Sequence, residues 1–397
     1  MKRTVGTVAR GLRAPIIKEG DDIVEVVVDT ILESAKESNF DIEDRDIIAL
    51  TESIVARAQG NYAAIDDIAA DVKQQFGDET VGVLFPILSR NRFMNLLKGF
   101  ARGAKDIVIQ LSYPADEVGN HLISLDQLDE AGVNPWSDTL TEEEFESHFG
   151  KTTHPFTGVD YVKLYNDIVA DEETSCTIIF SNDPHAILEY TDSVITADVH
   201  SRDRTKRILN DAGAKKVLDL GDILAKPVSK NGGYNAEFGL LGANNSTDES
   251  VKLFPSHSDD IVREIQAKVK EKTGKKIEAM VYGDGAFKDP VGEIWELADP
   301  VVSPGFTDGL AGTPNEVKLK YLADNDHADL SGEELQEAIK ESIGDKEDQA
   351  KDSNASLGTT PRQLTDLIGS LADLTSGSGD KGTPFVYIQG YFDDYTS

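Results

Sequence analysis

The sequence is poor in cysteine, in basic side chains and in long apolar runs. Its one cysteine, Cys176, has no partner for a disulfide within the chain. Because Cys176 stands in an apolar run, we expect a buried thiol and not a nucleophile. No run of about 18 apolar residues occurs, so we expect no membrane span. The opening residues 1–6 lack the apolar core of a signal peptide, so we expect a cytoplasmic protein.

Basic residues are outnumbered, with 39 Lys and Arg against 72 Asp and Glu, for a net charge of −33. This balance argues against sequence-independent nucleic-acid binding, which needs a basic surface. A phosphate-bearing ligand would need local cations, from a metal or from clustered Arg and Lys. The acidity also fits solubility demands or a salty or acidic habitat. With 39% hydrophobic residues in 397, the chain can form a real core in two or three lobes.

Apolar strands alternate with amphipathic helices, which predicts an α/β protein. The clearest case is a βαβαβ pattern in residues 175–225, where we expect a parallel unit. Asp198 and His200 follow its second strand, on the usual ligand side of such a sheet. No phosphate-loop motif accompanies them, so His200 can equally be a hydrogen-bonding residue at a helix start. The other predicted strands are 3–9, 46–51, 106–111, 276–282 and 385–389, and the predicted helices are 22–38, 62–75, 89–103, 160–170, 259–272, 331–343 and 361–374.

Two acidic turns stand out in the stretch 238–290. Asp248 lies in a polar turn after Gly242, and Asp284 lies between two glycines after the strand 276–282. Carboxylates on such turns can approach Mg²⁺, which fills its other positions with water and phosphate oxygens. The side chains of the first turn, Asn244, Asn245 and Ser246, can bind phosphate or a carboxylate. The alternative is that both aspartates only form turns, which Asp and Gly favour for local reasons.

The order of these features resembles the coenzyme F-420:gamma-glutamyl ligase family, which joins glutamate to a deazaflavin coenzyme precursor. The family has an Asn-Ala-Gly-Val-Asp-x-Ser-Asn-like turn, a Leu-Pro segment, a helix, and a strand ending in Ser-Asp-Thr-Phe-Gly-Arg. Three departures are visible: Gly285 follows the second aspartate, Ser53 and Arg57 replace two lysines, and Gln389 replaces a closing arginine. The segments that carry the resemblance are 14–22, 51–60, 243–250, 253–255, 283–288 and 382–390.

The resemblance implies a GTP-dependent ligase with Mg²⁺ or Mn²⁺ that joins L-glutamate to a small-molecule carboxylate acceptor through an acyl phosphate. It implies a homodimer, and a mixed, multi-lobe α/β fold. The ligase-like core would comprise residues 1–80 and 231–397, with an inserted α/β lobe at 81–230. In this reading Asp248 and Asp284 hold the metal, while Arg57 and Lys288 are catalytic. The nucleotide would be bound by Asn244, Asn245 and Ser246.

Two other readings stay open. A family member could keep the fold and bind an acidic ligand or nucleotide without ligating, as the changes at Gly285 and Gln389 suggest. A metal hydrolase would need a third ligand that the sequence does not identify. The acceptor is equally open, and deazaflavin, folate-like and other carboxylates all fit. A basic cluster in the region 81–230 either binds anions or balances nearby acids; its members are Arg90, Arg92, Lys98, Arg102 and Lys105.

Overall fold

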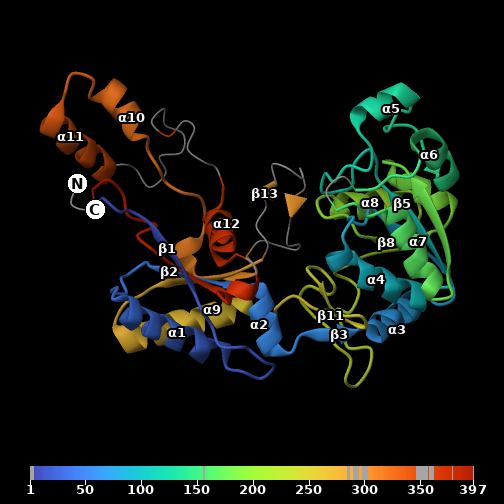
Figure 1. Ribbon diagram of the computed structural model, residues 1–397, viewed down its shortest axis with the longest axis horizontal. Coiled ribbons are helices and arrows are strands. Elements are labelled where there is room, and N and C mark those ends of the chain that lie inside the picture. Colours follow the sequence, from blue (N-terminus) through green and yellow to red (C-terminus); the bar gives the residue numbers. More distant parts are fainter. Residues whose placement is uncertain are drawn as a thin grey trace.

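The protein has a mixed α/β fold of several sheets and lobes (Figure 1). The computed structural model describes residues 4–154, 157–283, 303–345, 356, 362–377 and 379–396, and the backbone of the short strands β13 (Phe287–Lys288) and β14 (Trp295–Glu296).

The described residues near both ends of the sequence share a five-stranded sheet. Its central strand β2 (Ile47–Thr51) is apolar and almost wholly buried, because helices cover both of its faces. Helices α1 (Ile23–Ser38) and α9 (Ser258–Thr273) pack on one face, and α12 (Leu364–Ser376) packs on the other. Only the β2–β12 pair is parallel. Across the sheet the strands are β1 (Val8–Leu12), β16 (Phe385–Gln389), β2 (Ile47–Thr51), β12 (Glu278–Tyr282) and β15 (Gly305–Phe306).

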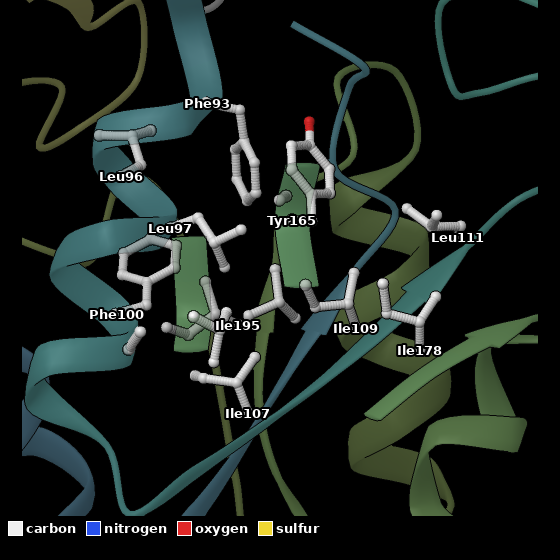
Figure 2. Packing of buried hydrophobic residues seen from close by; sticks show 14 of the residues in the cluster. Phe93, Leu96, Leu97, Phe100, Ile107, Ile109, Leu111, Tyr165, Ile178 and Ile195 are labelled. Carbon is white, nitrogen blue, oxygen red and sulfur yellow. The ribbon is translucent and has the colours of Figure 1, made fainter. Parts of the chain in front are cut away.

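A six-stranded sheet forms a second lobe, on the right of Figure 1. Figure 2 shows Phe93, Leu97 and Phe100 of α4 (Arg90–Gly103) packed on isoleucines of the sheet, beside Tyr165 of α7 (Tyr161–Asp171). On the opposite face lie η1 (Pro184–Glu189) and α8 (Arg202–Asp211). Across the sheet the strands are β6 (Leu140–Thr141), β7 (Ser175–Phe180), β5 (Asp106–Leu111), β4 (Thr80–Leu84), β8 (Ser193–Thr196) and β9 (Lys216–Asp219).

The predicted βαβαβ unit has parallel strands, but they are not all neighbours. Strands β5 and β4 lie between β7 and β8, so the sheet reverses its order at the β4–β8 pair. Such a reversal is where ligands bind in open α/β sheets.

A three-stranded sheet joins the two lobes, and here two local predictions were wrong. Residues 62–64 form strand β3 (Tyr62–Ala64) and not the first turn of a helix, since their backbone pairs with β11 (Ser250–Lys252). Helix α3 (Ile65–Phe76) begins only after it. The expected polar turn at 244–246 is likewise a strand, β10 (Asn244–Thr247), because it pairs with β11 in a hairpin.

Helix ends agree closely with the predictions where a side chain caps them. The Asp22 carboxylate accepts hydrogen bonds from the amides of Val24 and Glu25, both at 3.1 Å, and begins α1 as expected. The helix predicted over 331–343 is α11 (Gly332–Gly344), and the side chain of Ser331 before it makes no capping hydrogen bond. The first strand begins at Val8 and not near residue 3.

The remaining helices are short. No helix in the described ranges is both long and apolar enough to cross a membrane. The connecting helices are α2 (Glu52–Gln59), α5 (Leu125–Ala131), α6 (Glu142–Phe149), η2 (Asp308–Leu310), α10 (Leu319–Tyr321), η3 (Leu322–Asp326) and η6 (Gly379–Lys381).

Candidate functional site

A cavity of about 570 Å³ opens where the parallel strands β2 and β12 end side by side. Their last residues, Thr51 and Tyr282, are register partners, and both line the cavity. Burial raises the pKa of Tyr282, so its phenol stays protonated and can donate a hydrogen bond. The walls are completed by the loops 14–17 and 382–384 and by the end of α12.

Arg57 supplies a cation at this cavity. Helix α2 follows β2 directly, and it ends at Gly60, whose positive φ of 68° suits glycine. One turn before that end, the exposed Arg57 lines the cavity. Within the part of the chain that the structure describes, its guanidinium makes no hydrogen bond or ion pair. A guanidinium in such a place can take a carboxylate or phosphate in a two-pronged contact.

A second cation, Lys252, contacts a residue of the cavity wall. It is the last residue of β11, and its side chain is only 14% exposed. Its Nζ donates a hydrogen bond to Ser53 Oγ at 2.5 Å and lies 3.9 Å from the buried Glu52 carboxylate. Burial lowers the pKa of Lys252, and the nearby charges of Arg92 and Arg57 lower it further, against the opposing effect of Glu52. Sequence reasoning missed this residue, although a lysine inside the apolar run 251–254 was a usable signal.

The predicted nucleotide-binding residues lie on β10, against the start of α4. Asn244 Oδ1 accepts a hydrogen bond from Asn91 Nδ2 at 3.1 Å, and Asn245 Nδ2 donates to the Arg90 carbonyl at 2.8 Å. Ser246 is exposed. These contacts tie the hairpin to the second lobe, and the three residues are not among those lining the cavity.

Of the two predicted metal ligands, only Asp248 lies among the described residues. Asp248 is exposed at the turn of the β10–β11 hairpin, where its carbonyl accepts a hydrogen bond from Lys98 Nζ at 3.2 Å. Asp284, like Gly285, lies outside the described residues. It follows Tyr282 by two positions in the sequence. Among the residues with described side chains, no three His, Cys, Asp or Glu groups converge as a metal site.

Lys288, the other predicted catalytic residue, is placed only by its backbone. It pairs with Trp295 in the β13–β14 ribbon, and its side chain is outside the described part of the structure.

Acidic side chains neutralise the charges of Arg102 and Lys98 in the basic cluster. The guanidinium of Arg102 donates to both carboxylate oxygens of Glu172, at 2.8 and 3.2 Å, and to Asp66 and Glu249, and these bonds raise its pKa. Lys98 also pairs with Glu249. These side chains therefore hold α4 to its neighbours, while Arg92 on the preceding turns interacts with Lys252.

The reversal point of the six-stranded sheet carries paired acids. Ser201 Oγ lies 2.8 Å from Asp198 Oδ2 and 3.1 Å from Glu117 Oε1. The Ser201 hydroxyl has one proton, so it can donate to only one of these two oxygens. The contact with Glu117 then fits a protonated Glu117 that donates to Ser201 Oγ. Burial, with the nearby Asp198 charge, raises the pKa of Glu117 to about 7. Glu117 was not singled out from the sequence, because its neighbour Asp198 is 81 positions away.

Gln389 lies at the other end of the five-stranded sheet from the cavity. Strand β16 enters the sheet beside Leu50 at Phe385 and leaves it past Ile47. Gln389 Nε2 donates to Asp46 Oδ2 at 3.1 Å there. The change from the family-like arginine at this position therefore does not alter the described lining of the cavity.

The fold is that of an α/β protein with a cavity at the ends of two parallel strands. The chain matches the family described as F420-0:Gamma-glutamyl ligase over residues 11–390. Because this match covers nearly the whole sequence, the protein belongs to that family of gamma-glutamyl ligases. No curated protein matches the chain.

Proposed function

We propose that the protein is a GTP- and metal-dependent ligase that joins the amino group of L-glutamate to a carboxylate acceptor. The observation that carries this proposal is Arg57, a cation without a described partner at a cavity between the ends of β2 and β12, in a chain of the ligase family. Two substrates with negative charge need such a cation, and the rest of the chain is strongly acidic.

The chemistry requires an activated carboxylate. An acceptor carboxylate oxygen attacks the γ-phosphorus of GTP, the bond to the β-phosphate oxygen breaks, and GDP leaves. The glutamate nitrogen then attacks the acyl carbon, the C–O bond to phosphate breaks, and the nitrogen loses a proton. Positioning and charge neutralisation make up most of the catalysis in such a phosphoryl transfer. Arg57 would neutralise an oxyanion, and the hydroxyls of Ser53 and Tyr282 would orient it.

The cavity wall fits a hard metal ion. One carboxylate, Asp373, is among its described lining residues, together with several hydroxyl oxygens. Mg²⁺ commonly takes one or two carboxylates and completes its shell with water and phosphate oxygens. When bound, Mg²⁺ or Mn²⁺ would neutralise phosphate charge. We keep Asp248 and Asp284 as proposed ligands, Asn244, Asn245 and Ser246 as proposed nucleotide contacts, and Lys288 as a proposed catalytic residue.

The division into lobes is part of the proposal. We propose a ligase-like core of residues 1–80 and 231–397, and an inserted lobe of residues 81–230 that shapes the acceptor site. A homodimer is proposed from the family resemblance alone, and light scattering on the purified protein tests it.

Calorimetric titration of GTP and ATP, with and without Mn²⁺, tests the nucleotide and metal requirement. We expect Mn²⁺-dependent binding of GTP in preference to ATP. A second assay supplies GTP, Mn²⁺, glutamate and a panel of carboxylates, and follows GDP and amide together. GTP binding without amide from any acceptor would favour a repurposed binding protein. Binding of neither nucleotide would remove the ligase proposal.

Asp248→Asn and Asp284→Asn test the metal ligands in the same titration. We expect each change to weaken metal-dependent GTP binding. Asp260→Asn is a matched control, because Asp260 is an exposed aspartate in the first turn of α9. If both variants bind as the parent does, these residues are not ligands.

A further inference from the structure

Ser53 has a hydroxyl proton that no described group accepts. The residue lies in the first turn of α2, and its side chain lines the cavity beside Arg57. Its oxygen accepts a hydrogen bond from Lys252 Nζ. A protonated lysine amine has donors only, so in its charged form Lys252 donates and Ser53 accepts. The proton of Ser53 is therefore left to serve another acceptor.

Lys252 contacts Ser53 without itself lining the cavity. Ser53 lies in helix α2 and Lys252 in strand β11, 199 positions apart in the sequence, so the contact is made only by the fold. Lys252 is not among the residues that line the cavity. It is nearly buried, and a buried ammonium is costly unless its charge is used.

Charges of both signs act on Lys252. Glu52 is the carboxylate that opposes it, at 3.9 Å, while Arg57 and Arg92 both repel it. The fold thus brings Lys252 within the electrostatic reach of two other cations in a chain of net charge −33. An anion bound in the cavity would relieve this repulsion.

We propose that Lys252 is a positioning residue that fixes the Ser53 hydroxyl so that its proton points into the cavity. Ser53 and Arg57 then form a two-donor subsite for an oxyanion, either a phosphate group or a substrate carboxylate. The positive charge behind Ser53 polarises its O–H bond, which makes the hydroxyl a stronger donor. The role of this oxyanion in catalysis rests on the proposed ligase function, whereas the subsite itself does not.

The test uses the full-length protein and simple anions. Affinities for pyrophosphate and for L-glutamate are measured by calorimetry, because the first probes a phosphate subsite and the second a carboxylate subsite. The variants are Ser53→Ala, Lys252→Met and the double variant. We expect each single change to lower the affinity for one of the two anions about tenfold, as loss of a hydrogen bond to a charged group does. Because Lys252 acts through Ser53, the double variant should be no weaker than either single one.

Lys216→Met is the matched control. Lys216 is a half-buried lysine whose Nζ donates to the backbone and side chain of Gln75, in the second lobe. Its loss should leave both anion affinities unchanged. Thermal unfolding of each variant shows whether it is folded. If Lys252→Met does not fold, Lys252→Arg replaces it, and that variant should keep the affinity because it keeps the charge and a donor.

The outcomes separate this inference from the proposed function. Parent-like affinities for both anions in Ser53→Ala and Lys252→Met would overturn the inference, even if the parent ligates. Additive losses in the double variant would also overturn it, since they would mean independent roles. The inference would also be overturned if the unmodified protein bound neither pyrophosphate nor L-glutamate. Weakened pyrophosphate or glutamate binding in both variants would support it, even if no acceptor is ever ligated.

Discussion

Arg10 donates a hydrogen bond from Nη1 to Oε1 of Gln389, at 2.6 Å, across the antiparallel pair of the first and last strands. The guanidinium of Arg10 also lies over the Phe40 ring, 4.5 Å from its centroid. Gln389 uses its amide nitrogen on Asp46. A guanidinium is thus held beside position 389, although the sequence has lost the family-like arginine there. This pair packs the sheet at the end away from the cavity.

Gln389→Arg should therefore reduce stability and leave ligand binding unchanged. The new guanidinium would face Arg10 and remove its acceptor, so we expect the free energy of unfolding to fall by about 1–3 kcal/mol. Urea unfolding measures this change. The exchange variant Arg10→Gln with Gln389→Arg should recover much of the loss. If Gln389→Arg altered the KM and left the free energy of unfolding unchanged, the structural role of the contact between Arg10 and Gln389 would be contradicted.

Arg57→Met should have the opposite effect, because it should weaken ligand binding and leave stability nearly unchanged. Arg57 is exposed and has no partner among the described residues, so its loss should change the free energy of unfolding by less than about 0.5 kcal/mol. Its loss should weaken binding of the anionic substrate about tenfold or more, as expected for a charged hydrogen bond. Calorimetry and urea unfolding on the same preparation measure both.

The control for that change is Arg263→Met on the exposed side of α9. It removes the same charge from the protein without touching the cavity. Equal losses of affinity in the two variants would mean that Arg57 acts only through the net charge of the protein.

The pH dependence of stability should report on Glu117. Its pKa is about 7 in the folded protein, raised by burial from an ordinary value of 4.5. The folded state therefore binds this proton more tightly than the unfolded state does. The stabilisation is fully present below pH 4.5 and is lost as the pH rises through 7. Glu117→Gln, which keeps a neutral side chain at every pH, should melt like the parent at pH 4.5 and a few degrees higher at pH 8.5.

Glu146→Gln serves as the comparison, because Glu146 is an exposed glutamate on α6. Its melting curve should follow the parent at both pH values. The assignment to Glu117 is wrong if Glu117→Gln shifts the melting temperature equally at pH 4.5 and 8.5.

Sequence patterns predicted those elements that depend on local interactions. The cap at Asp22, the apolar stripe of α9 and the buried strand β2 can be seen in consecutive residues. Strands β3 and β10 could not be predicted, since their structure comes from pairing with β11 and not from their own pattern. The insertion of β4 and β5 between β7 and β8 is likewise a property of the assembled sheet.

The residues of the candidate site likewise divide into those that local sequence patterns predicted and those that only the fold brings together. Arg57 was predicted because it follows a buried strand within a family-like segment, and the structure places it at the cavity. The contact between Lys252 and Ser53 was out of reach, because no local pattern relates residues 199 positions apart. The basic cluster was ambiguous for a similar reason. Its acidic partners Asp66, Glu172 and Glu249 come from three distant segments.

That cluster leads to a last prediction, in which Arg102 acts as a structural residue. Its guanidinium joins α4 to carboxylates of three other segments, including the two-pronged contact with Glu172. Arg102→Met should lower the free energy of unfolding by about 1–2 kcal/mol, more than an isolated surface pair would. Lys105→Met is the control, because Lys105 is exposed and its Nζ lies 3.8 Å from the carboxylate of Asp106. Since salt screens these charges, the difference between the two variants should shrink in 1 M salt. Weaker nucleotide binding by Arg102→Met with unchanged stability would instead make Arg102 part of an anion site.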